Sequence, residues 1–296
     1  MHRRQTPLSR GEVIVLTEHL AFEQPTLFVF YKPSSSMEQG FYDELKKQCE
    51  SHSVGIEAIH LTTGEEPIAK KYEIVLTPAG IVYDRRGRQT SKATTVAEIV
   101  QAAMKASDVG RIDWAMPGTP EADQVKALMG TDDPRKLPGI MRAMSLKPEA
   151  MAGMIRMARM MHFSEGALKV RTKELIATYV SSMNQCKFCL SSHADFLAKQ
   201  GQEMPDVEAV GLGDPSKAPG LSPKERELLS YIKLLTEESW KVRDTDVERL
   251  RKVGWTDPEI YEATFDGALF AFFNRMANAY GLDYAANGWI PPKKKP

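Results

Sequence analysis

Two cysteines that stand three positions apart are the strongest chemical signal in this sequence. Cys186 and Cys189 occur in the run Cys-Lys-Phe-Cys, His193 follows four positions after the second cysteine, and Glu174 precedes the first by twelve. Thiols at this spacing either form half of a metal site or exchange electrons as a dithiol. An imidazole and a carboxylate can move the protons that thiol chemistry requires.

Two helices are expected to position these groups. The residue pattern predicts one helix over 173–183 and a second that Asn184 caps and that runs to about residue 199. In this arrangement Cys186 lies in the first turn of the second helix. The unpaired N–H groups of a helix N-terminus lower the pKa of a nearby thiol, so the pattern favours Cys186 as the more acidic thiol.

The spacing along the second helix places Cys186, Cys189 and His193 on one face. Residues three apart on a helix have Cα atoms ~5–6 Å apart, which is within disulfide geometry. An antiparallel preceding helix would bring Glu174 alongside them. We therefore take these four residues as the candidate catalytic set.

Other interpretations of the cysteine pair are weaker. Covalent haem attachment requires a histidine directly after the second cysteine, where this chain has Leu190. A structural zinc site requires four ligands, and the remaining cysteine, Cys49, lies in the other half of the chain. A mixed zinc site of Cys186, Cys189, His193 and Glu174 stays open as a minor alternative. We predict redox chemistry, with no cofactor and no metal.

With these residues in view, the C-terminal half resembles the alkylhydroperoxidase D family of the carboxymuconolactone decarboxylase superfamily. The resemblance extends from about residue 113 to 282 and includes the runs at 222–229 and 273–277. Decarboxylase branches of the superfamily lack the cysteine pair, so its presence favours the peroxidase-like branch. The resemblance implies an all-α domain that assembles into a homo-oligomer.

The resemblance also implies a role for each residue of the set. Cys189 would attack a peroxide and become a sulfenic acid, and Cys186 would take part in proton transfer and condense with it to a disulfide. Glu174 and His193 would form the proton relay. Some family members carry a further histidine just before the second cysteine, where this chain has Phe188. Electrons would come from an external dihydrolipoyl or thioredoxin-like protein.

The N-terminal half has an α/β pattern. Strands are predicted at 26–31, 54–61 and 79–83, the last closed by a hairpin turn, and helices at 41–49, 66–72 and 95–105. This order resembles a thioredoxin fold, with Thr77-Pro78 at the position of that fold's cis-proline. Where the redox cysteines of that family would stand, this chain has Ser34-Ser35-Ser36-Met37, so dithiol exchange is not expected there.

The domain boundaries follow from these patterns. We expect a thioredoxin-like domain without redox cysteines over 1–107, a linker rich in glycine and proline over 108–120, and a helical domain over 121–296. Capping-box patterns predict helix starts at Ser222, Thr245 and Thr256. Five methionines between 151 and 161 follow a helical spacing and are interpreted as packing residues. Cys49 lies on the apolar face of its helix and is predicted to be buried and unreactive.

Composition excludes several classes of function. The chain has 296 residues with 39 basic and 39 acidic side chains, and its pI is near 7.0. A nucleic-acid-binding domain usually has a pI above ~9. No apolar run approaches the ~18 residues of a spanning helix, and no secretory signal is evident, so we expect a cytoplasmic protein.

Two functions remain in competition at this level. The leading hypothesis is a thiol-dependent peroxidase that reduces organic or hydrogen peroxides through the cysteine pair. The alternative is a dithiol–disulfide oxidoreductase that acts on a protein partner docked by the N-terminal domain.

Overall fold

The structure, a computed structural model, describes residues 14–21, 24–51, 54–107, 110–116, 118–131, 134–285 and 288–292, without the side chains of 50, 51, 107 and 135. The chain forms two compact units, Met1–Arg111 and Ile112–Pro296. Residues 108, 109 and 117 of the expected linker lie outside the described residues. The two units are described separately below.

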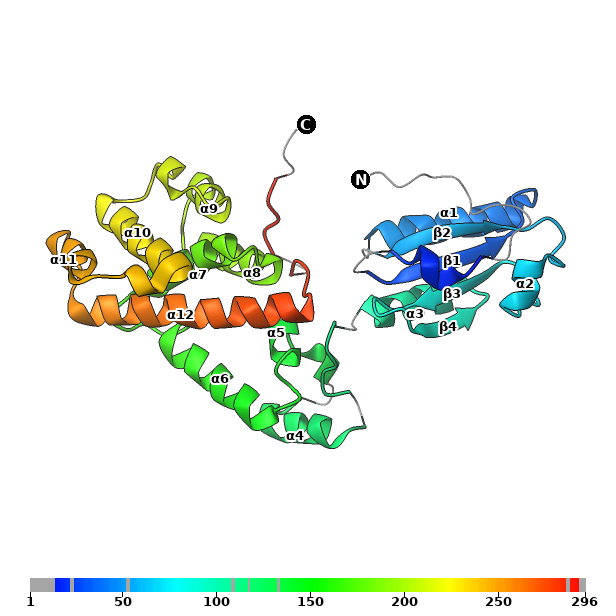
Figure 1. Cartoon of the computed structure of the whole chain (residues 1–296), viewed down its shortest axis with the longest axis horizontal. Helices are drawn as coiled ribbons and strands as arrows, with labels where there is room; N and C mark the ends of the chain where they lie inside the picture. The colour runs from blue at the N-terminus through cyan, green and yellow to red at the C-terminus, as the bar shows by residue number, and fades with distance from the viewer. Residues whose placement is uncertain are drawn as a thin grey trace. The chain divides into compact units, whose positions relative to one another are not determined.

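The first unit is an α/β layer whose element order follows the predicted pattern closely (Figure 1). Its elements, after a short 3₁₀ turn η1 (Leu16–His19), are β1 (Thr26–Tyr31), α1 (Ser36–Ser51), β2 (Gly55–His60), α2 (Pro67–Lys71), β3 (Ala79–Tyr83), β4 (Gln89–Ala93) and α3 (Val96–Ser107). The sheet order is β2-β1-β3-β4, and β1 pairs with β2 in parallel and with β3 antiparallel.

Strand β1 is the centre of this unit because both of its faces are buried. Leu27 and Val29 point into the cluster formed with α1 and α3, whereas Phe28 and Phe30 point into the cluster formed with η1 and α2. This alternation is the period of a strand, and burial on both faces explains the continuous apolar run. Cys49 of α1 is buried, and this burial raises its pKa to about 11, as expected of an unreactive thiol.

The turn after β1 is joined to the segment before β3 through one buried carboxylate. Glu38 accepts the backbone N–H of Lys32 at 2.7 Å and the hydroxyl of Thr77 at 3.0 Å. The Thr77–Pro78 peptide bond is cis, at the position that the sequence pattern singled out. The run Ser34–Met37 therefore stands beside this peptide, with no thiol in it.

The second unit is helical throughout its described residues. Its α-helices are α4 (Pro120–Met129), α5 (Gly139–Arg142), α6 (Pro148–Met161), α7 (Val170–Met183), α8 (Lys187–Lys199), α9 (Met204–Gly211), α10 (Pro223–Glu238), α11 (Asp244–Lys252) and α12 (Asp257–Tyr280), with short 3₁₀ turns η2 (Pro134–Lys136), η3 (Pro215–Lys217) and η4 (Ser239–Lys241). Figure 1 shows α12 running along the bundle beside α7, α8 and α10, with which it is in contact.

The predicted helix starts are correct in two of three cases. Glu225 accepts the backbone N–H of Ser222 at the start of α10, and Glu259 accepts that of Thr256 at the start of α12. Helix α11 begins one residue before Thr245, so the prediction of Thr245 as its cap is wrong. Asp246 reaches back to the N–H of Arg243 instead, because an acidic side chain three residues on satisfies the same free donor.

Helix α7 is the buried core of this unit, with ten consecutive buried residues from Thr172 to Ser181. It packs against α8, α9, α10 and α12, so side chains that project from it meet several helices at once. A carboxylate or hydroxyl carried by α7 must find its partners inside the protein.

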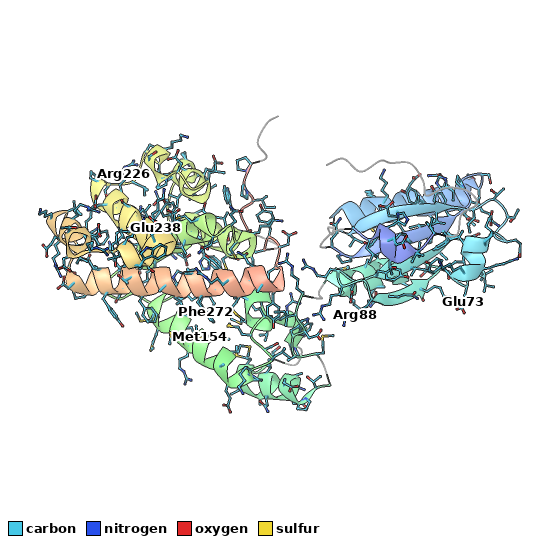
Figure 2. The ribbon with its side chains drawn as sticks, in the orientation of Figure 1. Glu73, Arg88, Met154, Arg226, Glu238 and Phe272 are labelled. Carbon is cyan, nitrogen blue, oxygen red and sulfur yellow. The ribbon has the colours of Figure 1, made fainter. Side chains whose placement is uncertain are left out.

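Arg226 of α10 donates to backbone carbonyls of η3 and of the residue after it, and thereby holds the loop before α10 (Figure 2).

The methionines of α6 are divided between core and surface. Met151 is buried and Met154 packs against the same cluster as the two cysteines, whereas Met160 is exposed. Figure 2 labels Met154 on α6 and Phe272 on α12, two helices that are in contact. Packing within the protein therefore explains Met151 and Met154 but not the exposed Met160.

Across the described ranges, no helix has both the length and the apolar character needed to cross a bilayer.

Candidate active site

A tight reversal between α7 and α8 places the first cysteine. Helix α7 ends at Asn184, and Gln185 takes a left-handed conformation (φ 51°) that turns the chain. Cys186 is therefore the N-cap of α8, and its N–H returns to the carbonyl of Ser181 at 2.9 Å. The prediction that Asn184 caps α8 is wrong, because Asn184 closes the preceding helix. Cys186 stands one position outside the first turn.

Both thiols of the pair are buried and hydrogen-bonded to each other. Cys186 is 0% and Cys189 3% exposed, and neither is in a disulfide. A hydrogen bond from the Cys189 thiol, together with the N–H groups of Cys189 and Phe188, lowers the pKa of Cys186. The same sulfur–sulfur hydrogen bond and burial raise the pKa of Cys189 well above its ordinary value. Cys186 is therefore the more acidic thiol of the pair, and Cys189 the less acidic one.

A buried asparagine on α12 supports this pair. The Asn274 side chain hydrogen-bonds both sulfurs, which lowers the pKa of each. Its amide also donates to the Ser181 hydroxyl at 3.0 Å, and its carbonyl accepts from the Asn184 amide at 3.0 Å. Asn274 thus links α12 to the turn that carries Cys186, so the position of the thiols depends on three helices.

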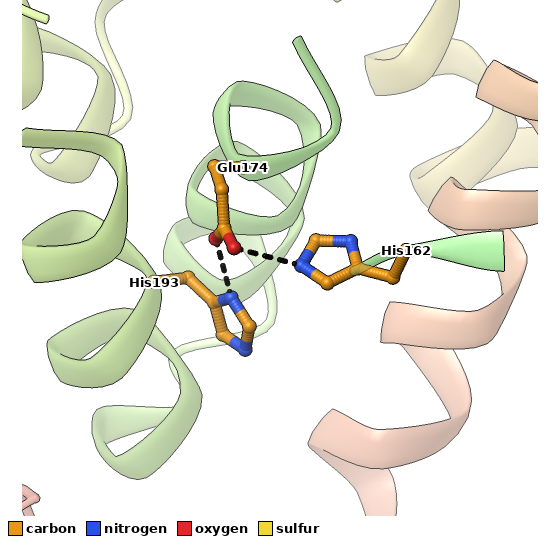
Figure 3. A group of neighbouring side chains, drawn as sticks. All are labelled: His162, Glu174 and His193. Atoms are coloured by element: carbon orange, nitrogen blue, oxygen red, sulfur yellow. Dashed lines mark hydrogen bonds and ion pairs between the residues drawn. The ribbon is translucent and has the colours of Figure 1, made fainter. Parts of the chain in front are cut away.

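A second hydrogen-bonded group lies further along α7 and α8. The Glu174 carboxylate accepts from Nδ1 of His193 at 2.7 Å and from Nε2 of His162 at 3.1 Å, one imidazole on each oxygen (Figure 3). The structure therefore brings Glu174 and His193 together, as the antiparallel helix pair predicted. His162 is the cap at the end of α6, and its Nδ1 contacts Asp266 of α12 at 2.9 Å.

The charges of this group are set by burial and by their neighbours. Burial lowers the pKa of His162, but Asp266 and Glu174 outweigh it and raise this pKa to about 9. Burial raises the pKa of Glu174, but His193 and His162 outweigh it and lower this pKa to about 2. Burial raises the pKa of Asp266 against the opposing pull of His162. The two acidic neighbours therefore favour a protonated His162.

Aromatic rings enclose the two imidazoles. The Phe270 ring lies 4.6 Å from that of His162 and 4.5 Å from that of His193. Phe163 and Phe196 contact His193 at 6.2 and 5.5 Å and are themselves partly exposed. Apolar walls of this kind keep water away from the network, which strengthens the electrostatic interactions inside it.

The same network also has the geometry of a candidate metal site. His162, Glu174 and His193 offer three ligand atoms that lie within 4.8 Å of one another, a spacing that a divalent ion would also accept. The alternative mixed site, which combined both thiols with His193 and Glu174, does not occur as a cluster among the described residues. Both oxygens of Glu174 already accept a hydrogen bond, so the cluster is complete as a proton network.

Three residues of the site were not in the candidate set taken from the sequence. Asn274 stands in the run at 273–277 that carried the resemblance, and that run was its signal. His162 and Asp266 lie 104 positions apart and meet only through the packing of α6 on α12. The sequence shows a histidine at a helix end and an aspartate in a largely apolar helix, but it does not show that their side chains are in contact.

Comparison with known proteins supports the superfamily for the C-terminal half. Residues 148–214 match the sequence profile of the carboxymuconolactone decarboxylase family, a range that contains Glu174, both cysteines of the pair and His193. No curated protein sequence matches the chain.

Solved structures share the fold of this half. An uncharacterized peroxidase-related protein from Ralstonia eutropha JMP134, described as an alkylhydroperoxidase AhpD core, is 22% identical with a TM-score of 0.52, covering 60% of this chain and 93% of that one. A peroxidase-related protein from Silicibacter sp. TM1040 is 22% identical with a TM-score of 0.50, covering 60% and 92%. The debrominase Bmp8 is also similar, at 14% identity and a TM-score of 0.45, covering 60% and 92%.

Proposed function

We propose that this chain, whose C-terminal half has the sequence profile and fold of the alkylhydroperoxidase D and carboxymuconolactone decarboxylase superfamily, is a thiol-dependent peroxidase. Cys186 and Cys189 are the electron donors to the peroxide. Glu174 and His193 supply a proton to the oxygen that leaves. One observation carries the proposal: the two buried thiols are hydrogen-bonded to each other at the N-terminus of α8, and His193 stands on the same helix in contact with Glu174.

The reaction begins with a proton transfer inside the pair. The Cys186 thiolate takes the proton of Cys189 along the hydrogen bond between them. The Cys189 thiolate attacks the terminal oxygen of the peroxide ROOH and becomes a sulfenic acid, and RO⁻ leaves. The Cys186 thiol then condenses with the sulfenic acid, which forms the disulfide and releases water. Cys186 serves as base first and as resolving thiol second.

The proton balance of this sequence requires one proton from outside the pair. One thiolate, one thiol, one peroxide and one proton give one disulfide, one alcohol and one water. The alcoholate RO⁻ needs that proton, and the imidazole of His193 is the natural donor because histidine titrates near neutral pH. Reduction of the disulfide by an external dithiol returns the thiolate, the thiol and the proton. The cycle therefore closes without net proton consumption at the site.

Lowering a thiol pKa cannot by itself produce useful peroxidase activity. A fall from ~8.5 to ~6.5 increases the thiolate fraction at neutral pH about 25-fold, but the nucleophilicity of the sulfur falls roughly eightfold. The net gain is about threefold. General acid catalysis contributes ~10²–10⁴-fold, so proton donation by His193 is the larger contribution.

The burial of the thiols favours a small substrate. Both sulfurs are almost inaccessible, whereas a dithiol that exchanges with a protein disulfide must present a sulfur to a macromolecule. A hydroperoxide group is small enough to enter between the side chains. The dithiol–disulfide oxidoreductase therefore remains the second candidate, and it would require an opening at α8.

For the first unit we propose a thioredoxin-like fold without redox function. The sheet order supports the fold, and the turn at 34–37, which contains no cysteine, is the reason that we expect no dithiol exchange there. Met37, Val75 and Leu76 near this peptide are 73%, 89% and 69% exposed, which suits a docking surface for an extended segment of the electron donor. We propose that this donor is a dihydrolipoyl or thioredoxin-like protein and that the chain acts as a cytoplasmic homo-oligomer.

The test is rapid mixing of the fully reduced chain with cumene hydroperoxide, followed by mass spectrometry of the peptide that contains residues 186–189. We expect fast loss of two thiols and a Cys186–Cys189 disulfide. Cys189→Ser should abolish the fast phase, and Cys186→Ser should leave a sulfenic acid that dimedone traps. Cys49→Ser is the matched control and should react like the wild type, because Cys49 lies in the other unit.

Oxidation no faster than that of a free thiol at the same pH would reject the peroxidase. In that case the same reduced protein, mixed with a disulfide-bonded protein substrate, tests the second candidate directly. A sulfenic acid on Cys186 in the Cys189→Ser variant, formed at the wild-type rate, would reverse the order of the two sulfurs and leave the proposed activity standing.

A further inference from the structure

We propose that His162 and Asp266 are a positioning pair that sets how firmly His193 holds the proton it donates, an inference that rests on the proposed peroxidase. His162 does not touch the substrate in this scheme. It acts on Glu174, whose carboxylate it shares with His193 (Figure 3).

Hydrogen-bond geometry makes His162 a cation when both of its acidic partners are ionised. An ionised carboxylate can only accept, and both ring nitrogens of His162 contact carboxylate oxygens, at 2.9 Å to Asp266 and 3.1 Å to Glu174. Both nitrogens must then carry hydrogen. The imidazole is 0% exposed, so these two carboxylates replace water as its solvent. The second oxygen of Asp266 has no hydrogen-bond partner within the described part of the chain, so the charge of Asp266 is directed at His162.

The groups that face His162 come from each helix packed around it. Glu174 comes from α7, His193 from α8 and Asp266 from α12. Lys173 is adjacent on α7, but its ammonium is already paired with Glu262 and with the carbonyl of Ser164. The two carboxylates and the His162 cation therefore leave one negative charge. A single proton on His193 neutralises the network, and one proton is what the reaction consumes.

Loss of the His162 charge would leave the two carboxylates facing His193 alone. The two imidazole centroids are 5.1 Å apart. At this distance and an effective dielectric constant of ~20, one unit charge shifts the titration of its neighbour by roughly two pH units. His193 would then keep its proton to higher pH and donate it more slowly at neutral pH.

The experiment compares pH profiles of the peroxide reaction for the wild type and four variants. In His162→Gln the amide can still donate to Glu174 but carries no charge, and in Asp266→Asn the His162 cation loses its main stabilising anion. We expect His162→Gln to move the alkaline limb of the profile up by about two pH units and to slow the reaction roughly tenfold at neutral pH. Asp266→Asn also removes one of the two carboxylates, so its shift should have the same direction but be smaller. Glu174→Gln should move the limb down. His60→Gln, in the first unit, is the matched control and should leave it in place.

A second measurement does not depend on peroxidase activity. Nitrogen-15 NMR of the histidine rings in the reduced wild-type protein should show both nitrogens of His162 protonated at about pH 7, and in Asp266→Asn one of them should lose its proton. The wild-type spectrum can be measured whether or not the variants fold. If His162→Gln is unstable, the kinetic test can be made with Asp266→Asn.

Three results would overturn the inference. If the His162→Gln and Asp266→Asn proteins fold but the alkaline limb of their pH profiles does not move, the pair has only a structural role. A neutral His162 in the wild-type spectrum would place the proton on Asp266. Tight zinc binding by the Cys186→Ser/Cys189→Ser protein, lost in His162→Gln, would make the cluster a metal centre. A wild-type protein that ignores peroxide but shows the His162 cation would reject the proposed function and leave the charge assignment intact.

Discussion

The buried His162 cation predicts that the helical unit loses stability as the solution becomes alkaline. The pKa of His162 rises from 6.5 to about 9 on folding, a difference worth about 3 kcal/mol. A group whose pKa is raised on folding stabilises the folded state fully below its unfolded value, and the contribution disappears as pH rises through its folded value. The loss should therefore occur between about pH 6.5 and about pH 9.

The expected magnitude can be worked out for each pH. The His162 charge contributes about 3 kcal/mol at about pH 6, about 1 kcal/mol at about pH 8 and almost nothing at about pH 10. A loss of this size is a large part of the ~5–15 kcal/mol that keeps a typical domain folded. It is large enough to measure by urea denaturation, in which the free energy falls linearly with denaturant.

Tryptophan fluorescence isolates the unit concerned. All four tryptophans, at 114, 240, 255 and 289, lie in the helical unit, so their emission reports its unfolding without interference from the first unit. The Cys186→Ser/Cys189→Ser protein serves as the parent, because ionisation of the thiols would otherwise add its own pH dependence. The reference is this parent with His162→Gln and Asp266→Asn added, which removes both opposite charges and keeps the side-chain sizes similar.

The parent should lose about 3 kcal/mol more than the reference between about pH 6 and about pH 10. Equal losses in both proteins would refute the assignment of the charge to His162. At acidic pH the free energy of unfolding should change in the opposite direction, and fall as pH falls. The pKa of Glu174 is lowered to about 2, so its contribution is present above its ordinary range and is lost as pH falls through the folded value.

Three further predictions concern single side chains. Asn274→Leu removes the amide that supports both sulfurs, so alkylation of Cys186 by iodoacetamide should require higher pH and the peroxide reaction should slow roughly tenfold; an unchanged alkylation profile would contradict this role. Cys49, whose pKa is raised to about 11, should stay unmodified by a disulfide reagent in the native protein at about pH 8 and react once urea unfolds it. Lys173→Met leaves the partly buried Glu262 without its cation and should destabilise the helical unit by about 3 kcal/mol, which urea denaturation checks against the exposed control Lys217→Met.

The local features of this protein were predictable from the sequence because they depend on residues that are close along the chain. The order of strands and helices in the first unit follows from apolar periodicity, and the starts of α10 and α12 follow from capping boxes. The dithiol motif and its spacing to Glu174 and His193 are likewise properties of one short segment. The start of α8 was missed because Gln185 adopts a left-handed conformation that no local pattern announced.

Only the tertiary structure decided how the protons are arranged. The sequence favours Cys186 as the more acidic thiol, but Asn274, 88 positions further on, completes its hydrogen bonds. His162 becomes a cation because α6 ends where α12 presents Asp266 and α7 presents Glu174. Charge states inside a protein depend on which groups replace water around each side chain. Those groups come from distant segments, so candidate site residues could be named from the sequence, whereas their hydrogen-bond partners and charges required the fold.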